Sequence, residues 1–377
     1  MRGRVLTPLQ EWALGWVRVE GARITDCGEG DPPSALTAGT VEVHGGPEHV
    51  VAPGFCDLQV NGIAGVDAAD GAEAMAAIAD RLPRHGVTAF CPTVITGPLH
   101  LLVQAPAAAR RAAQAGGTRA KILGIHQEGP FLSPHRPGAH DPSQLRPPDA
   151  SALDWVVQAG PRVVTLAPEL PGAVPAIRQL AAAGITVSAG HSDATAEEAQ
   201  AGFDAGIRMA THLFNAMSPL RHRAPGLPGA ALADDRVTAG LIADGLHVDP
   251  VVLTVVARAK GAGRIALTSD IVAAAGAPAG RYRLGTQEVS SDGDRVTLDD
   301  GTMAGSASPL DDLVRTMATL PGVGLRAAVE MASATPARLL GCAAGRIARG
   351  APADLVLLDR ARRVVLTVIE GEVAYRA

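Results

Sequence analysis

The chain has 377 residues, a formal net charge of −5 and a hydrophobic fraction of 47%. This length suits one large domain with an appendage, or two domains. The acidic balance and the lack of a long basic run argue against nucleic acid or a membrane surface as a partner. No apolar run approaches the ~18 residues of a membrane span. The four scattered cysteines, without a C-x-x-C pair, and the polar N-terminus predict a cytoplasmic protein.

The first 49 residues contain short alternating runs, WVRVEGARITDCG and TVEVHG, that are typical of hairpin strands. The tail contains similar runs, ADLVLLD and RRVVLTVIEGEVAYR. We therefore expect residues 1–49 and 345–377 to form one small, discontinuous β-sandwich domain.

The middle of the chain alternates between β-rich runs and Ala-rich helical stretches. Strands that alternate with helices indicate a parallel sheet, and eight such repeats predict a closed (β/α)8 TIM barrel over residues 50–344. The predicted strands are 50–60, 86–93, 122–128, 163–169, 185–191, 208–212, 237–244 and 264–270, and the clearest helices are 72–82, 173–183, 195–203 and 251–260.

Polar residues close four of the predicted strands. Glu128, His191 and His212 end three of them, and the active sites of TIM barrels lie at this end of the strands. One carboxylate and two imidazoles can hold zinc with a position left open for water, although iron, cobalt or manganese would accept the same ligands. Asp270 ends a fourth strand and could move protons as a general base and acid, or simply cap the following segment.

The first predicted barrel strand, APGFCDLQVNG, carries Gln59 and Asn61 at alternate positions on one face. A site for two metal ions would use a histidine pair there. Because neutral amides are poor ligands for transition metals, the strand indicates one ion. The amides would then either form hydrogen bonds in the barrel mouth or act at the site through water.

Two irregular loops, 133–150 and 215–230, are candidates for function. The first contains His140 and the second contains Arg223, whose guanidinium suits a phosphate or a carboxylate. His247 follows the seventh predicted strand. The more ordinary interpretation of each is a surface side chain.

Several segments together resemble the N-acetylglucosamine-6-phosphate deacetylase family of the amidohydrolase superfamily. The resemblance extends over essentially the whole chain and is carried by PGFCDLQVNG, GIHQEGPFLSPHRPGAH, AGHSDAT, THLFNAM, ADGLHVD, TSDIVAAAGAP, TMAGSA and the tail GRIARGAPADLVLLD. It implies an amidohydrolase-type TIM barrel that hydrolyses the acetamide of N-acetyl-D-glucosamine 6-phosphate to glucosamine 6-phosphate and acetate, in amino-sugar catabolism or cell-wall recycling.

The resemblance also implies roles for particular residues. It implies one divalent ion per subunit, with zinc as the first expectation and Fe2+, Co2+ or Mn2+ as alternatives, and a homodimer in which Arg223 reaches the neighbouring subunit's site. The main departure is Ser269-Asp270-Ile271-Val272, where the family more often has T-D-A-x, so the fit of the acetyl pocket is in question. The implied metal ligands are Glu128, His191 and His212; the catalytic residues are Asp270 and His140; the substrate contacts are Ala139, His140, Asn215, Ala216, Arg223, His247, Met303, Ala304 and Gly305.

Two other functions stay open at this stage. An amidohydrolase acting on a cyclic amide or an N-acyl amino acid would have no use for the phosphate contacts of Arg223 and His247. A non-catalytic sugar-phosphate binder would need neither Asp270 nor the three metal ligands.

Overall fold

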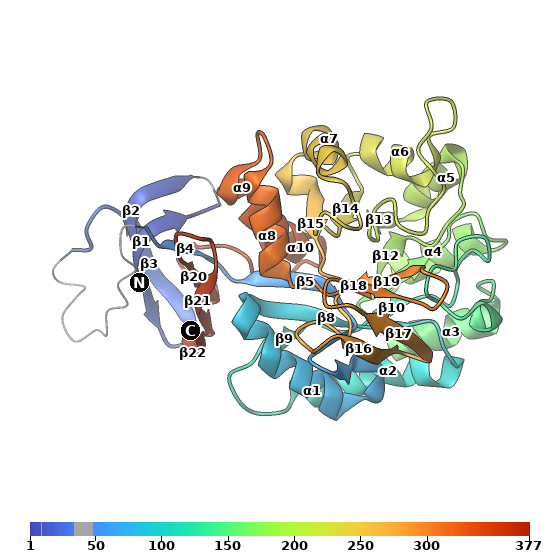
Figure 1. The fold of residues 1–377 in the computed structure, drawn as a ribbon, viewed down its shortest axis with the longest axis horizontal. Helices are drawn as coiled ribbons and strands as arrows, with labels where there is room; N and C mark the ends of the chain where they lie inside the picture. Colours follow the sequence, from blue (N-terminus) through green and yellow to red (C-terminus); the bar gives the residue numbers. More distant parts are fainter. Residues whose placement is uncertain (9, 34–47) are drawn as a thin grey trace.

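The computed structural model describes residues 1–8, 10–33 and 48–377, and its main body is a parallel β-barrel surrounded by helices (Figure 1). Each of the eight predicted runs contains a barrel strand, which confirms the predicted fold class. The strands are β5 (Phe55–Val60), β8 (Val87–Ile95), β10 (His126–Glu128), β11 (Val163–Leu166), β12 (Thr186–Ala189), β13 (Ile207–Ala210), β14 (Thr238–Leu241) and β15 (Ile265–Leu267), paired in this order.

The barrel closes between β15 and β5 through the residues that follow β15. Ile271 forms a parallel bridge with Val60, and the backbone N–H of Asp270 donates to the carbonyl of Gln59 at 3.0 Å. The N–H of Asn61 donates in turn to the carbonyl of Ile271 at 2.8 Å. The seam therefore joins the segment that carries Asp270 to the strand that carries the two amides.

Ala-rich amphipathic helices cover the outside of the barrel, as their apolar spacing requires. The predicted helices 72–82, 173–183, 195–203 and 251–260 are present, and Thr195 and Glu198 form a capping box at the start of α5. The helices are α1 (Ala72–Arg81), α2 (Leu99–Ala113), α3 (Ala150–Ala159), α4 (Ala173–Ala182), α5 (Ala196–Ala205), α6 (Gly226–Ala233), α7 (Pro250–Lys260), α8 (Leu310–Thr319), α9 (Gly324–Ala332) and α10 (Ala334–Leu339). Within the described ranges, no helix is both long and apolar enough to span a membrane.

Two of the predicted strands are divided. The run 50–60 separates at Gly54 into β4 (Val50–Pro53) and β5, and a side chain at Gly54 would lie only 2.3 Å from Thr88. The run 122–128 separates into β9 (Lys121–Ile122) and β10 around Gly124, whose φ of +121° favours glycine. The chain thus changes direction where only glycine fits.

The two ends of the chain meet in one seven-stranded sheet beside the barrel (Figure 1). β4 belongs to this sheet, where it lies between β1 and β20, although the sequence indicated a barrel run from residue 50. The expected strand 40–45 lies outside the described residues. The strand order is β22 (Glu372–Arg376), β21 (Val364–Ile369), β20 (Leu355–Leu358), β4, β1 (Arg2–Leu6), β2 (Glu11–Glu20) and β3 (Arg23–Glu29).

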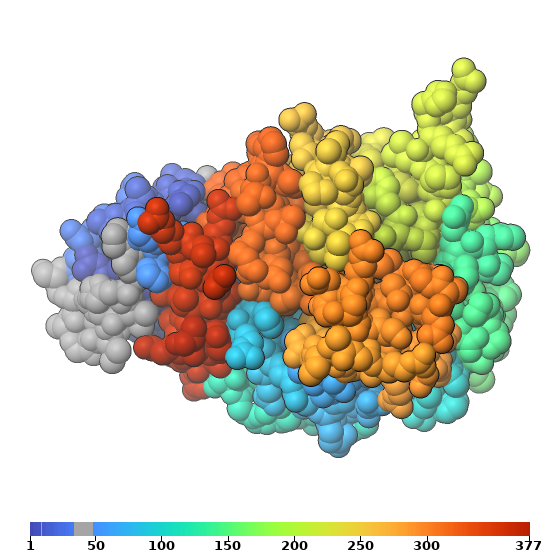
Figure 2. Space-filling view, viewed as in Figure 1, coloured from blue at the N-terminus to red at the C-terminus, as the bar shows by residue number. Residues whose placement is uncertain are grey.

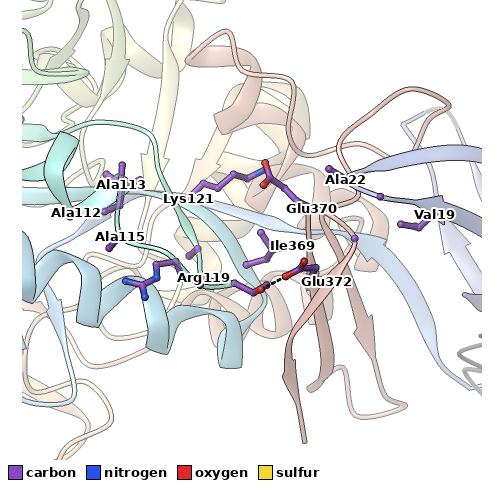
Figure 3. Close-up of a pocket in the computed structure, with 16 residues that line it drawn as sticks. Val19, Ala22, Ala112, Ala113, Ala115, Arg119, Lys121, Ile369, Glu370 and Glu372 are labelled. Atoms are coloured by element: carbon purple, nitrogen blue, oxygen red, sulfur yellow. Dashed lines mark hydrogen bonds and ion pairs between the residues drawn. The ribbon is translucent and has the colours of Figure 1, made fainter.

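An ionic contact joins this sheet to the barrel next to a surface groove (Figure 3). Lys121 Nζ of β9 lies 2.6 Å from the buried carboxylate of Asp354 and 3.5 Å from Glu370. Asp354 Oδ1 also accepts the backbone N–H of Glu370 at 3.0 Å. The lysine therefore connects the barrel to the segments that flank β20 and β21.

A four-stranded antiparallel sheet follows β15 and packs in front of the barrel (Figures 1 and 2, orange). It was not predicted, although Asp-Gly pairs at 292–293 and 300–301 are hairpin turn signals. We call residues 280–306 the hairpin insert. Its strands are β16 (Gly280–Leu284), β17 (Gln287–Ser291), β18 (Arg295–Thr297) and β19 (Met303–Ser306).

Candidate active site

The four residues predicted from strand ends lie together at the carboxyl end of the barrel. Glu128 is the last residue of β10, and the other three follow β12, β13 and β15 by two or three residues. His191, His212 and Asp270 have φ angles of +48°, +30° and +50°. This left-handed region is uncommon for residues other than glycine and is frequent at functional sites. The backbone turns sharply after each strand and directs these side chains inward.

Three of these side chains face a common point. The Nε2 atoms of His191 and His212 are 3.1 Å apart, and they lie 3.3 and 2.9 Å from Glu128 Oε1. A tetrahedral ion with bonds of about 2.0–2.1 Å holds its ligand atoms about 3.3 Å apart. The observed spacing is close to that edge, so the three side chains fit a divalent ion.

Hydrogen bonds from outside this cluster determine which ring nitrogen carries the proton in His191 and in His140. The carbonyl of Arg136 lies 3.1 Å from His191 Nδ1 and can only accept, so it takes the Nδ1 proton and leaves Nε2 free to bind metal. The reverse holds for His140, because the backbone N–H of Thr96 donates to its Nδ1 at 3.2 Å. His140 Nε2 therefore carries a proton and lies 3.6 Å from Glu128 Oε2.

The same hydrogen bonds distinguish the candidate ligands. Atoms of Glu128, His140 and His191 all lie within 4.8 Å of one another, so position alone would also admit His140 as a ligand. A nitrogen that carries a proton cannot bind metal but can donate a hydrogen bond to a carbonyl oxygen. His212 Nε2 lies 2.9 Å from Glu128 Oε1, nearer than either other ring nitrogen, which suits a ligand position.

Asp270 lies beside this cluster in a buried position that favours its protonated form. Burial, and after it the charge of Glu128, raise the pKa of Asp270 to about 7. Asn61 Nδ2 donates to Asp270 Oδ1 at 2.7 Å, and Gln59 Nε2 donates to Glu128 Oε1 at 3.2 Å. The two amides of the first barrel strand thus hold the two carboxylates directly, without an intervening water.

A cavity of about 470 Å³ opens above these side chains. Its lining includes Asn61, which the sequence placed at the barrel mouth. It also includes Leu284, Asp300 and Thr302 of the hairpin insert, which sequence reasoning missed. The predicted site residues that line it are Glu128, Ala139, His140, His191, His212, Asn215, Ala216, His247, Asp270, Met303 and Gly305.

Two predicted substrate contacts do not line the cavity of their own chain. Ala304 is fully buried and packs in an apolar cluster with Val272, while its neighbours Met303 and Gly305 face the cavity. Arg223 lies at the exposed tip of a hairpin closed by the pair Arg221 and Ala224, and this hairpin stands away from the body of the molecule (Figure 2, yellow-green).

The two residues after Asp270 that depart from the family pattern, Ile271 and Val272, pack in the interior. Ile271 bridges both Val60 and Ser306 and is 1% exposed, and Val272 is fully buried. A side chain at Gly305 would lie 2.4 Å from Val272, and Gly305 has a φ of +72°, so glycine is needed there. Neither side chain lines the cavity, so the two departures lie outside its wall.

Comparison with known proteins agrees with this geometry. The amidohydrolase family profile matches residues 50–374. N-acetylglucosamine-6-phosphate deacetylase from Bos taurus is 41% identical over 350 residues, covering 87% of this chain and 84% of its own length. The chain therefore belongs to the amidohydrolase family.

Two further relatives are amino-sugar phosphate deacetylases. The enzyme from Mycobacterium smegmatis, solved as an aspartate-to-alanine mutant in complex with N-acetyl-D-glucosamine-6-phosphate, superimposes with a TM-score of 0.92 at 34% identity, covering 99% of this chain and 98% of its own. N-acetylgalactosamine-6-phosphate deacetylase from Escherichia coli O157:H7 is 37% identical, with 96% of both chains covered.

Proposed function

We propose that this chain hydrolyses the acetamide of N-acetyl-D-glucosamine 6-phosphate, giving glucosamine 6-phosphate and acetate. The observation that carries the proposal is the convergence of Glu128, His191, His212 and Asp270 at one end of the barrel. Near-complete structural similarity to an enzyme solved with that sugar phosphate supports the choice of substrate.

Glu128, His191 and His212 would hold one divalent ion, for which we propose zinc. Such an ion supplies a Lewis acid that polarises the amide carbonyl and activates water. His140 adds a hydrogen bond from Nε2–H to the carbonyl oxygen, where charge develops in the transition state. Loss of one such donor typically costs about 3–4 kcal/mol of transition-state stabilisation.

Asp270 moves the protons of the reaction. As the water oxygen bonds to the acetyl carbon, Asp270 accepts the water proton, and it then delivers that proton to the nitrogen as the C–N bond breaks. Asn61 fixes one carboxylate oxygen of Asp270 through its 2.7 Å hydrogen bond. The other oxygen is left available for the proton.

We propose that a second copy of the chain completes the phosphate site with Arg223. In its own chain Arg223 stands on an exposed hairpin, and exposed apolar side chains on and before α7 provide a surface for a partner: Leu246, Val251 and Val255. The hairpin and α7 both lie along the upper edge of the molecule (Figures 1 and 2). His247 would contact the phosphate from within the chain.

An acetate-release assay on the metal-loaded protein tests the proposed reaction. We expect turnover of N-acetylglucosamine 6-phosphate well above that of the unphosphorylated sugar. Turnover of N-acyl amino acids or cyclic amides in its place would contradict the proposal. The galactosamine 6-phosphate epimer is the second candidate substrate because a relative with 96% coverage is named for it, and the same assay compares the two epimers.

Metal analysis tests the number of ions. The amide nitrogens of Gln59 on β5 and of Asn61 just after it already donate to carboxylates, so we expect one tightly bound equivalent per chain. Two tightly bound equivalents in protein purified without added metal would contradict the single site.

Mixed dimers test the shared site. Arg223→Ala should lower kcat/KM for the phosphorylated sugar by at least ~10-fold, because charge-assisted hydrogen bonds contribute about 1.5–3 kcal/mol each. The ratio of kcat/KM for the phosphorylated sugar to kcat/KM for the unphosphorylated sugar should decrease. A heterodimer of Arg223→Ala with Asp270→Asn contains one site with both residues intact and should recover activity. No recovery in a confirmed heterodimer would exclude a contribution across the interface.

A further inference from the structure

A buried carboxylate faces the imidazole of His247 in the turn after β14. Asp244 Oδ1 accepts the backbone N–H groups of Leu246 and His247 at 2.8 and 2.9 Å. Asp244 Oδ2 lies 2.7 Å from His247 Nδ1, and the two side chains are 2% and 4% exposed. One carboxylate therefore fixes both the turn and the ring.

The hydrogen bonds determine which nitrogen of the ring faces the cavity. Burial is the largest single influence and raises the pKa of Asp244, but the contacts with His247 and the backbone N–H groups of Leu246 and His247 together outweigh it and lower that pKa, so the carboxylate is ionised and only accepts. His247 Nδ1 consequently carries a proton directed at Asp244. The opposite nitrogen, Nε2, is left for the cavity that His247 lines.

A carboxylate at this distance also stabilises the ring when both nitrogens carry protons. In that form Nε2–H can donate to an anion, and the ring brings a positive charge to the same place. A neutral ring with its proton held on Nδ1 would present only a lone pair, which repels an anion.

We propose that Asp244 is a positioning residue that holds the His247 ring with a charged Nε2–H aimed at the 6-phosphate. This inference rests on the proposed function. Asp244 reaches the substrate only through His247, and it gives the phosphate a fixed cation in the same chain, beside the Arg223 offered by the second copy.

Two substitutions of Asp244 distinguish the effect of its contact with the His247 ring from the effect of its hydrogen bonds to the turn. Asp244→Asn can keep Oδ1 on the two backbone N–H groups, which places its NH2 group opposite His247 Nδ1. Nδ1 must then accept, and the ring becomes neutral with its proton on Nε2. Asp244→Ala removes the turn hydrogen bonds as well, so the difference between the two variants measures the turn.

Kinetics on both substrates test the proposal. For Asp244→Asn we expect kcat/KM for the phosphorylated sugar to fall about 10-fold, mainly through KM, because a charged donor is replaced by a neutral one. The preference over the unphosphorylated sugar should narrow by a similar factor. The double variant Asp244→Asn/His247→Gln should be no worse than His247→Gln. Losses that add, or that are equal on both substrates, would overturn the proposal.

Nitrogen NMR of the ring gives a readout that needs no substrate. In metal-loaded protein with labelled histidine, the signals lost in His247→Gln identify the ring. We expect a protonated Nδ1 in the wild type and an unprotonated Nδ1 in Asp244→Asn. An unprotonated Nδ1 in the wild type would overturn the inference, whereas absence of acetate release by the wild type would overturn the proposed function alone.

Discussion

The left-handed backbone of His191, His212 and Asp270 places reactive groups where ordinary strand geometry would not. Successive side chains along a strand point alternately into and out of the barrel. A sharp turn after the strand can instead direct the next side chain across the barrel mouth. Backbone strain of this kind costs about 1–3 kcal/mol at each residue and persists when the surroundings enforce it. The packed seam and the buried cluster supply that enforcement.

Asp270→Asn tests the proton transfer. The amide keeps the shape of the side chain but cannot accept a proton, so we expect activity to fall by roughly 10²–10⁴. Metal content should persist because Glu128, His191 and His212 are unchanged. Asp204→Asn, at an exposed aspartate of α5 paired with Arg236, is a control that leaves Glu128, His191, His212 and Asp270 and their partners unchanged. Wild-type turnover in a metal-replete Asp270→Asn protein would rule out the assigned role.

The pKa of Asp270 predicts an acidic limb in the activity profile. Burial and Glu128 raise this pKa to about 7, and a bound cation nearby lowers it again. The base works only when ionised, so kcat/KM should fall as the pH decreases through a midpoint at or below about 7. Metal content measured at each pH separates this limb from loss of the ion. Activity that rises toward acid would contradict the assignment.

At the scale of the elements, a chain of hydroxyl groups crosses the barrel interior beneath the candidate metal site. The carbonyl of Leu58 accepts the Nδ1 proton of His126 at 2.9 Å, so Thr165 must donate to Nε2 at 2.7 Å. Thr211 then donates to Thr165 at 2.7 Å, and Ser188 donates to Thr211 at 2.6 Å. The donor and the acceptor of each hydrogen bond in this buried chain are therefore determined, from Ser188 through Thr211 and Thr165 to His126.

Thr211→Val should break this chain. The substitution keeps the shape but leaves the buried Ser188 hydroxyl without an acceptor, whereas Thr165 keeps its hydrogen bond to His126; one unsatisfied buried group costs about 1–3 kcal/mol. Denaturant unfolding should show a lower free energy with an unchanged slope. Thr319→Val, at an exposed helical hydroxyl bonded to Thr316, is the matched control and should change little. Equal effects of the two variants would refute the role of the network.

The sequence pattern predicted the barrel strands because mostly apolar β-rich runs alternate with Ala-rich helical stretches. It also placed Glu128, His191, His212 and Asp270 at one end, since parallel strands share that end. It could not find Thr96, which acts on His140 from 44 residues away through a backbone N–H that any residue would offer. Asp244 is three residues from His247, a spacing that any turn allows, so only the structure reveals the pair.

At the scale of the whole molecule, an ion pair links the barrel to the side sheet, between the half-buried Lys121 and the buried carboxylate of Asp354. Lys121→Met leaves that carboxylate buried without its cation, and we expect a loss of about 1–3 kcal/mol, less than for a fully buried pair because water screens the lysine. Lys121→Met/Asp354→Leu should recover part of the loss in thermal or denaturant unfolding. Asp80→Ala, which breaks the pair between Arg119 and the exposed carboxylate of Asp80, should cost less than about 1 kcal/mol. A Lys121→Met protein as stable as the wild type would show that the junction rests on apolar packing.

The hairpin insert leaves the barrel and returns to it at adjacent points. Ile271 pairs with Ser306, and the N–H of Ser306 donates to the carbonyl of Asp270 at 2.8 Å. The excursion between them, residues 272–305, therefore begins and ends at one point of the barrel. Because it supplies cavity residues but none of the proposed metal ligands, substitutions on its cavity side can change which acylated sugars are accepted while the proposed metal site stays the same.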